Sequence, residues 1–303
     1  MNLKKIALIP LVTLASACSP LTLVNGVAHF YDADVIRDVS YGDDTKLALD
    51  YYLPNKSKID TSVATPVIVF FYGGSWNDGD KKDYSFVGRR LASQGYIVAV
   101  ANYRLYPQVT YPDFLYDSAK AVAQVMTDIR TERFKDWHAD DRVFLMGHSA
   151  GAYNTAMLAL DDRWLQSQSL QRTSLLRGWI GLAGPYDLYP INLEDVRPVF
   201  HYPDYPPNSN PIEFVDQADV PALLLAPEDD NLVDTQRNTY SLAEAMTRLD
   251  KPHTMLTISG TSHITIIGTL SPLLFFKGST LEPINTFIQQ HSSGMSSTLA
   301  SEI

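Results

Sequence analysis

Residues 142–160 read RVFLMGHSAGAYNTAMLAL, and this stretch decides the fold. Arg142–Met146 is short and almost continuously apolar, as expected of a strand that is buried on both faces of a sheet. The motif G-H-S-A-G follows directly at positions 147–151, and a stretch with helical periodicity continues to Leu160. In a sharp turn from strand to helix, the serine is forced into a strained, exposed position at the carboxyl edge of the sheet. We therefore predict that such a turn presents Ser149 at that edge.

Short β-rich stretches alternate with longer stretches of helical periodicity on both sides of this turn. The predicted strands are Val35–Tyr41, Lys46–Leu53, Pro66–Phe71, Ile97–Asn102, Arg142–Met146, Trp179–Ala183, Ala222–Ala226 and His253–Ile258. The predicted helices are Tyr84–Gln94, Tyr116–Arg130, Ala150–Leu160, Thr239–Leu249 and Leu281–Gln290. This alternation predicts a doubly wound α/β domain whose mostly parallel, eight-stranded sheet carries helices on both faces. The first two strands are expected to form an antiparallel hairpin at the sheet edge.

The composition excludes several classes of protein. With 303 residues, 45% of them hydrophobic, the chain can bury a large core, which rules out a disordered or fibrous protein. Its single cysteine cannot form an internal disulfide or a thiolate metal cage, and no H-E-x-x-H motif occurs. A net charge of −10 repels phosphate backbones. We therefore expect no metal, no cofactor and no nucleic-acid partner.

The first residues have the pattern of a bacterial export signal. Two lysines precede the apolar run Ile6–Ala15, which is too short to span a bilayer. Cys18 follows small residues in an order that resembles the lipobox of bacterial lipoproteins, in which the cysteine is acylated and becomes the mature N-terminus. A simple export signal cleaved near the same point is the alternative. We expect a protein that is lipid-anchored in the cell envelope, at the outer membrane or the periplasmic face, or otherwise periplasmic or secreted.

The remaining chain is expected to hold one domain. We assign residues 1–17 to the signal peptide, 18–34 to a tether, 35–291 to the α/β domain and 292–303 to a flexible tail. Between Pro185 and Pro211 lie seven of the eighteen prolines and four tyrosines, too many helix breakers for a helical lid. We expect an ordered aromatic loop after the sixth strand, because long ordered loops in compact domains are usually functional. A solvated insertion without a role is the alternative.

A pair of glycines follows another predicted strand. The motif Y-G-G-S-W at 72–76 comes directly after the apolar strand VIVFF. Consecutive glycines at a strand end can turn backbone N–H groups toward an acyl oxygen, and the first turn of the helix after Ser149 offers one more. We expect the N–H groups of Gly73, Gly74 and Ala150 to form an oxyanion hole. A plain tight turn is the alternative for the two glycines.

A serine presented in this way needs a carboxylate and a histidine, in the chain order serine, acid, base. His263 follows the last predicted strand, where the base must come, whereas His148 lies inside the turn and His253 begins a strand. The acidic stretch PEDDNLV follows the strand ALLLA. We expect Asp230 to orient His263, with Asp229 as the alternative acid. A solvated acidic turn is the alternative for the whole stretch.

These residues resemble α/β-hydrolase esterases of the feruloyl/acetylxylan esterase-like group, which is close to kynurenine formamidases and hormone-sensitive-lipase-like carboxylesterases. The matching positions are Val39–Gly42, Leu49–Pro54, Gly73–Lys81, Ala101–Leu105, Tyr111, Pro112, Asp117 and the motif at 147–151. The resemblance runs from about Val35 to His291. It implies an α/β-hydrolase fold and a catalytic triad of Ser149, Asp230 and His263. It also implies that Gly73, Gly74 and Ala150 are the oxyanion donors.

Two departures from the resemblance bear on the substrate. Tyr72 stands where the family usually has a histidine that helps to order the oxyanion loop. The Asp-Pro-Leu acid motif of the lipase-like branch is missing, which favours the feruloyl/acetylxylan esterase-like branch. We expect Tyr72, Trp76, His148 and Tyr186 to line the substrate pocket.

The expected function is that of a serine carboxylesterase, which hydrolyses small or aryl acyl esters through an acyl-enzyme. An arylformamidase is the alternative within the enzyme class, since the G-G-x-W loop is shared. A catalytically silent envelope protein that uses the fold for binding is the alternative from another class. Long-chain lipase action is disfavoured, because no apolar helical lid is visible in the sequence. The expected partners are a small ester substrate and the lipid of a bacterial membrane.

Overall fold

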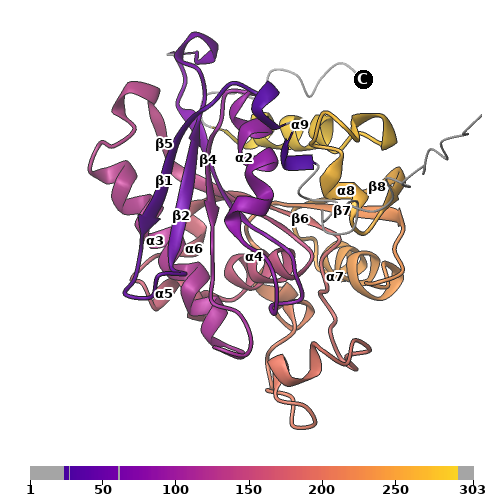
Figure 1. The fold of residues 1–303 in the computed structure, drawn as a ribbon. Helices are drawn as coiled ribbons and strands as arrows, with labels where there is room; N and C mark the ends of the chain where they lie inside the picture. Colours follow the sequence, from indigo (N-terminus) through magenta and orange to yellow (C-terminus); the bar gives the residue numbers. More distant parts are fainter. Residues whose placement is uncertain (1–23, 27, 61, 293–303) are drawn as a thin grey trace, which may run out of the picture.

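An eight-stranded sheet forms the centre of the molecule (Figure 1). The computed structural model describes residues 24–26, 28–60 and 62–292. The strands lie in the spatial order β1-β2-β4-β3-β5-β6-β7-β8. Their bounds are β1 Asp34–Ser40, β2 Ala48–Leu53, β3 Thr65–Phe71, β4 Ile97–Ala101, β5 Ala139–His148, β6 Leu176–Leu182, β7 Ala222–Asp229 and β8 His253–Ser262. Each predicted strand overlaps an observed one, and the predicted α/β-hydrolase fold is confirmed.

The strand directions bring several loops to one edge of the sheet. β1 and β2 form the expected antiparallel hairpin, and β2 is also antiparallel to β4. All other neighbours, from β4 through β3 to β8, run parallel. In an open parallel sheet, ligands bind outside the carboxyl ends of the strands. The loops after β3, β5, β7 and β8 therefore meet at the edge where a site is expected.

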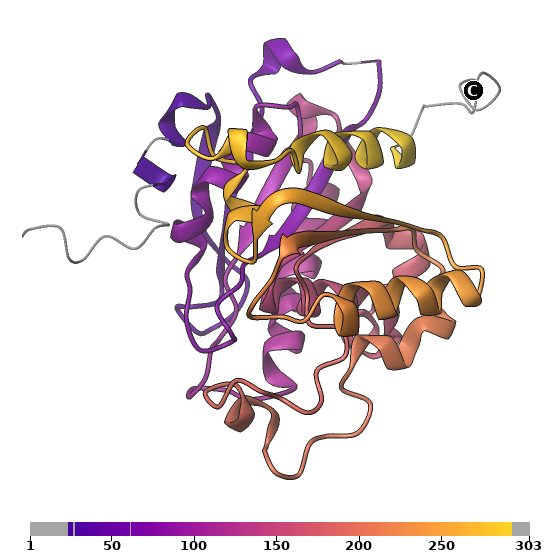
Figure 2. The ribbon, with the colours of Figure 1, turned by 90° about the vertical axis from the view of Figure 1, so that its right-hand side faces the viewer.

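Helices cover both faces of the sheet (Figures 1 and 2). The longer ones are α2 Ser85–Ala92, α3 Asp113–Arg130, α4 Ala150–Leu160, α7 Ser241–Arg248 and α9 Leu281–His291. α2 and α9 lie on one face, and α3, α4 and α7 lie on the other. Because both faces are covered, β4 is buried over its whole length, which explains why its sequence IVAVA is continuously apolar.

The structure also contains short helices that the sequence pattern did not predict. The α-helical ones are α5 Asp162–Gln166, α6 Arg172–Leu175 and α8 Thr265–Gly268. The 3₁₀ turns are η1 Ala28–Phe30, η2 Lys56–Lys58, η3 Lys81–Tyr84, η4 Lys135–Trp137, η5 Arg197–Phe200, η6 Pro211–Gln217 and η8 Phe275–Lys277, and η7 Gln236–Tyr240 is a π-helical turn before α7. Each has seven residues or fewer, too few for a helical periodicity to stand out.

The proline- and tyrosine-rich segment after β6 contains only the short turns η5 and the start of η6. Its aromatic side chains pack on one another and on Trp76 of the loop after β3. The rings of Tyr189 and Tyr205 stack with their centroids 4.2 Å apart. Phe200 is buried and meets Trp76 edge to face at 4.9 Å. The segment thus forms an aromatic wall beside the loop that follows β3.

The stretch expected to be a tether packs on the domain where it is described. Val24 and Ala28 are buried. The Asn25 side chain donates to the carbonyl oxygens of Lys82 and Asp83 and accepts from the N–H of Phe86, at 2.6 to 3.1 Å. These contacts tie residues 24–26 to the start of α2, so free tether does not extend to residue 34. Cys18 and residues 293–303 lie outside the described part of the chain. No helix in the described residues is both long and apolar enough to cross a membrane.

Candidate active site

Ser149 stands on a strained turn between β5 and α4. Its backbone has φ 53° and ψ −121°, a conformation that residues with a Cβ rarely adopt. The turn closes tightly because its two glycines lie against other backbone. A Cβ on Gly147 would lie 2.1 Å from the carbonyl oxygen of Gly151, and one on Gly151 would lie 2.1 Å from that of Phe71. The N–H of Ser149 donates to the carbonyl oxygen of Leu182 in β6 at 2.9 Å, which anchors the turn to the neighbouring strand.

His263 follows β8 and reaches Ser149 across the edge of the sheet. Its Nε2 lies 2.8 Å from Ser149 Oγ. The side chain of His263 is 6% exposed, so water has little access to this hydrogen bond. The geometry allows the imidazole to take a proton from the serine hydroxyl.

Asp230 supplies the carboxylate on the other side of the imidazole. Its Oδ2 lies 2.8 Å from His263 Nδ1, and its Oδ1 accepts from the N–H groups of Leu232 and Val233 at 2.9 and 2.8 Å. Burial raises the pKa of this carboxyl, but the hydrogen bonds and the neighbouring imidazole outweigh burial and lower the pKa below its usual value. Asp229, the alternative acid, is exposed at the end of β7. The structure thus brings Ser149, Asp230 and His263 together and leaves Asp229 aside.

The glycine pair after β3 lies directly beside the serine turn. A Cβ on Gly73 would lie 2.9 Å from Ser149 Cβ, which explains why this position has no side chain. Gly74 has φ +138° and accepts through its carbonyl oxygen from the N–H groups of Asn77 and Asp78 at 3.1 and 2.9 Å. Ala150 is the first residue of α4, so its N–H has no partner within the helix. All three expected donors therefore belong to backbone that adjoins Ser149.

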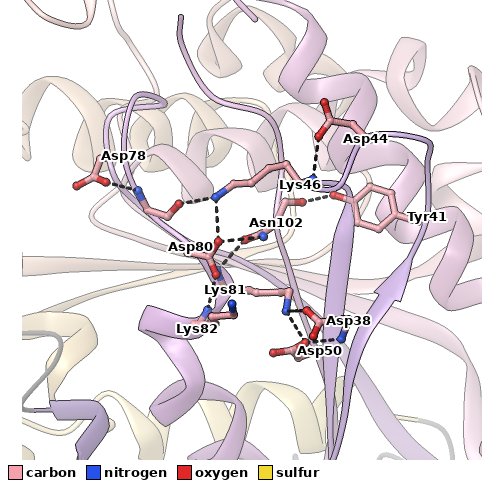
Figure 3. Close-up of polar contacts among 11 residues, drawn as sticks. Asp38, Tyr41, Asp44, Lys46, Asp50, Asp78, Asp80, Lys81, Lys82 and Asn102 are labelled. Carbon is pink, nitrogen blue, oxygen red and sulfur yellow. Dashed lines mark hydrogen bonds and ion pairs between the residues drawn. The ribbon is translucent and has the colours of Figure 1, made fainter. Parts of the chain in front are cut away.

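A network of ions holds the far end of this loop (Figure 3). Lys46 Nζ donates to the carbonyl oxygen of Gly79 at 2.8 Å and to Asp80 at 3.0 Å. The buried Lys81 lies between Asp38 and Asp50, with its Nζ 2.6 Å from an oxygen of each. The network links the loop after β3 to the hairpin of β1 and β2.

A cavity of about 140 Å³ opens beside Ser149. Besides Ser149 and Ala150 of the turn after β5, its walls come from three segments: the loop after β3, the start of the segment after β6, and the segment after β7. The lining residues are Ser75, Trp76, Ser149, Ala150, Pro185, Asp187, Leu188, Pro190, Ile191, Asn192, Leu193, Val196, Leu232, Val233, Asp234, Arg237 and Asn238. Sequence reasoning missed most of the second and third segments, since irregular backbone gives no periodicity from which an inward-facing side chain can be identified.

Of the four residues predicted to line the pocket, only Trp76 does so. Its indole Nε1 donates to Asn154 Oδ1 at 3.0 Å, which fixes the ring in the wall. The prediction for Tyr72 and Tyr186 is wrong: both are fully buried. The Tyr186 hydroxyl points at Gly181 of β6, where a Cβ would lie 2.0 Å from it, and Tyr72 packs in the core behind the loop that follows β3.

His148 does not line the cavity either, and instead supports the backbone of His263. Its Nε2 donates to the carbonyl oxygen of His263 at 2.8 Å. Burial, together with the nearby imidazole of His263, lowers the pKa of His148 to about 3. His148 is therefore neutral, which adds no positive charge next to His263.

The cavity has a polar end formed by the segments after β6 and β7. Arg237 faces both carboxylate oxygens of Asp187 at 3.4 Å, and Asn238 Oδ1 accepts from the N–H groups of Tyr186 and Asp187 at 2.7 and 2.9 Å. These contacts tie the two walls to each other. Among the described residues, no group of three or more His, Cys, Asp and Glu side chains could hold a metal ion.

Comparison with known families shows to which family the chain belongs. The sequence profile of the BD-FAE family matches residues 49–246, well over half of the chain. The chain belongs to the BD-FAE family. The matched stretch of this BD-FAE member contains Ser149, Asp230 and the glycine pair, whereas His263 lies beyond it.

Two similar proteins and one similar structure extend the comparison. The isoprenylcysteine alpha-carbonyl methylesterase of Arabidopsis thaliana is 33% identical over 187 residues, which cover 59% of this BD-FAE chain and 42% of the plant protein. The kynurenine formamidase of Danio rerio is 28% identical over 156 residues, which cover 52% of this chain and 48% of the Danio rerio protein. The chain thus matches less than half the length of either relative. A tributyrin phosphonate-inhibited esterase B from Lactobacillus rhamnosis shares the fold, with a TM-score of 0.68 at 18% identity over 88% of this chain and 90% of that one.

Proposed function

We propose that this protein is a carboxylic ester hydrolase with Ser149 as its nucleophile. The observation that carries the proposal is the continuous chain of hydrogen bonds from Ser149 through His263 to Asp230, with 2.8 Å at each step. The strained turn under the serine and the backbone of Gly73, Gly74 and Ala150 beside it support the same chemistry. Membership of the BD-FAE family and the similarity to a methylesterase agree with it.

The reaction follows from the roles of these groups. Ser149 Oγ attacks the acyl carbon while His263 Nε2 takes the hydroxyl proton. The carbonyl oxygen becomes an oxyanion, which accepts hydrogen bonds from the N–H groups of Gly73, Gly74 and Ala150. The imidazolium then gives its proton to the leaving alkoxide oxygen, and an alcohol departs from the acyl-enzyme. Water attacks the acyl-enzyme by the same route, which releases the carboxylic acid and restores Ser149.

The size of the cavity argues for a small or aryl acyl group. A cavity of about 150 Å³ is known to accept benzene, and the space beside Ser149 is about 140 Å³. Apolar side chains such as Leu188, Ile191 and Val196 form much of its wall, which suits an alkyl or aromatic group. A long acyl chain would exceed this space.

The test is hydrolysis of p-nitrophenyl acetate by purified protein and by its Ser149→Ala variant, together with fluorophosphonate labelling. We expect turnover and labelling of the wild-type protein and loss of both in the variant. Unchanged hydrolysis by Ser149→Ala would refute the assignment of the nucleophile. A protein that neither hydrolyses esters nor reacts with fluorophosphonate would instead be a binding protein built on the hydrolase fold.

Formamide hydrolysis is a second candidate, favoured by the similarity to a kynurenine formamidase. The same groups would serve, with an amine in place of the alcohol as leaving group. The specificity constant for N-formylkynurenine, compared with that for phenyl acetate under the same conditions, separates the two. A higher value for the formamide would assign the protein to amide hydrolysis.

We also propose that the protein is exported and anchored through Cys18. The support is the sequence pattern of residues 1–18 alone, in which the cysteine follows an apolar run and small residues. Two acyl chains give the stable membrane attachment that one chain does not. The test is metabolic labelling with a fatty acid in a bacterial host. Label in the wild-type protein that is lost in Cys18→Ser supports the anchor, and a secreted, unlabelled wild-type protein contradicts it.

A further inference from the structure

Three tyrosines form a buried stack behind the oxyanion loop. Tyr72 begins this loop, Tyr103 lies just beyond the end of the neighbouring β4, and Tyr84 ends η3. The ring of Tyr72 stacks on Tyr103 with centroids 4.7 Å apart and on Tyr84 at 5.7 Å, with interplanar angles of 20° and 22°. All three side chains are buried. Gly79 passes over the Tyr72 ring, where a Cβ would lie 2.7 Å from a ring carbon, so the loop folds back onto the stack.

The two outer tyrosines donate to the carbonyl groups of the oxyanion loop. The hydroxyl of Tyr103 donates to the carbonyl oxygen of Tyr72 at 2.7 Å. The hydroxyl of Tyr84 makes a longer contact, 3.4 Å, to the carbonyl oxygen of Gly73. Burial raises the pKa of the Tyr103 hydroxyl well above its ordinary value, so this group keeps its proton and stays a donor. The Tyr72 hydroxyl has no hydrogen-bond partner among the described residues.

These contacts fix the direction of the N–H groups in the same peptide units. A trans peptide is planar, and its C=O and N–H bonds point in opposite directions. When Tyr103 holds the carbonyl of Tyr72, the N–H of Gly73 is turned away from Tyr103. When Tyr84 holds the carbonyl of Gly73, the N–H of Gly74 is turned away from Tyr84. Gly73 itself abuts Ser149, so a rotation of either peptide would move a donor away from the reacting oxygen.

We propose that Tyr103, assisted by Tyr84, is a positioning residue that sets the direction of the oxyanion-hole donors. Its hydroxyl holds the peptide from Tyr72 to Gly73 in the orientation that the oxyanion needs. The loop is thus supported by two hydroxyl groups from the elements that flank it. This inference rests on the proposed function.

Tyr103→Phe tests the inference, because it keeps the stacked ring and removes only the hydroxyl. We expect kcat for p-nitrophenyl acetate to fall about 10- to 100-fold, less than the 10²- to 10³-fold typical of losing an oxyanion donor outright. KM should stay within about twofold, since the donors act mainly in the transition state. The Ki of phenylboronic acid, which forms a tetrahedral adduct on the serine, should rise in parallel with the fall in kcat. Tyr84→Phe should have a smaller effect of the same kind because of its longer contact.

Tyr96→Phe is the matched control. Tyr96 is also buried and also donates from its hydroxyl, at 3.0 Å, but to Asn285 on α9. We expect this variant to keep wild-type kcat and boronate affinity even if its melting temperature falls. A fall in kcat in both variants would assign the effect to general loosening of the fold. Wild-type kcat and boronate affinity in Tyr103→Phe would overturn the inference.

The outcomes separate this inference from the proposed function. Activity that survives Ser149→Ala would refute the nucleophile, whatever Tyr103 does. Loss of activity in Ser149→Ala combined with full activity in Tyr103→Phe would refute only the positioning role. If Tyr103→Phe does not fold, the test rests on Tyr84→Phe. An unchanged kcat and an unchanged boronate Ki in Tyr84→Phe would count against the inference. A fall in kcat with a parallel rise in Ki would support it.

Discussion

Gly151 packs against the end of β3 so closely that a Cβ on it would lie 2.1 Å from the carbonyl oxygen of Phe71. The serine turn and the strand that carries the oxyanion loop are therefore in direct backbone contact. Any added atom at Gly151 must push one of them away. Because Ser149 lies two residues before Gly151, such a shift changes the distance between Ser149 Oγ and the N–H groups of Gly73 and Gly74.

Gly151→Ala is expected to damage both stability and catalysis. Forcing a methyl group into this contact should lower the free energy of unfolding by about 3 kcal/mol, the upper end of the usual overpacking range. The specificity constant should fall about 100-fold, since small misplacements of reacting groups have effects of this size. Urea unfolding and ester hydrolysis measure the two effects. Gly26→Ala is the control, because a Cβ there meets nothing within 4 Å; equal losses in both variants would contradict the argument.

Asp230 and Asp229 are neighbours, but substituting them should have opposite effects on kcat: a large loss for Asp230 and no change for Asp229. Asp230→Asn should reduce kcat about 10³- to 10⁴-fold, because the amide no longer favours the required tautomer or the imidazolium of His263. Asp229→Asn should leave kcat unchanged, since this side chain is exposed and makes no contact with His263 in the described structure. Steady-state kinetics on both purified variants decide the matter. The reverse ranking would identify Asp229 as the acid.

His148 should make the fold sensitive to acid. Its pKa is about 3 in the folded protein but 6.5 when unperturbed, so below pH 6.5 the unfolded chain binds a proton that the folded chain does not. Stability is then lost as pH falls from 6.5 toward 3, by up to about 1.4 kcal/mol per pH unit. In His148→Gln, the free energy of unfolding should fall by about 2 to 3 kcal/mol less than in the wild type between pH 6.5 and 4.5. Urea unfolding across this range is the measurement. An equal slope in wild type and His148→Gln would mean that other groups cause the acid sensitivity.

The sheet, and the meeting of Ser149, Asp230 and His263 at its edge, could be predicted from the sequence because both depend on where the strands end. Continuous apolar runs mark strands that are buried on both faces, and the carboxyl ends of parallel strands meet at one edge. Ser149 and Asp230 each follow such a run, and His263 follows β8, an edge strand with many exposed positions, so all three come after strands whose carboxyl ends meet.

The cavity walls could not be predicted in this way. Ile191 and Val196 lie in irregular backbone, where no period separates inward from outward side chains. The errors at Tyr72 and Tyr186 have the same origin: proximity in sequence to a site residue says nothing about which face a side chain takes. Tyr72 follows β3 directly, yet its ring turns into the core and stacks on Tyr103.

Lys81 should be a large contributor to stability at the far end of the oxyanion loop. Its side chain is 3% exposed, and its ammonium group lies between Asp38 and the fully buried Asp50 (Figure 3). Lys81→Met removes the close cation from the buried Asp50 and leaves it the N–H of Asp38 at 2.8 Å and the half-exposed Arg37 at 3.6 Å, which should destabilise the protein by about 3 to 5 kcal/mol. Lys82→Met, at the exposed neighbouring position, should change stability by less than about 0.5 kcal/mol. Guanidinium unfolding of both variants provides the test, and a loss below 1 kcal/mol in Lys81→Met would refute it.

Val196 should set the acyl-chain preference, because it is 2% exposed and its side chain forms part of the cavity wall. Val196→Ala enlarges the cavity and Val196→Phe fills it, so the two changes act in opposite directions. Each methylene group that gains or loses a place in an apolar pocket changes the specificity constant by about 10-fold or more. We expect the ratio of hexanoate to acetate hydrolysis to rise in Val196→Ala and to fall in Val196→Phe, with acetate affected less than hexanoate in both. Specificity constants for p-nitrophenyl esters of two to eight carbons measure the ratio. Parallel changes for all chain lengths would show that the acyl group lies elsewhere, on the side of Leu232 and Val233 or outside the cavity.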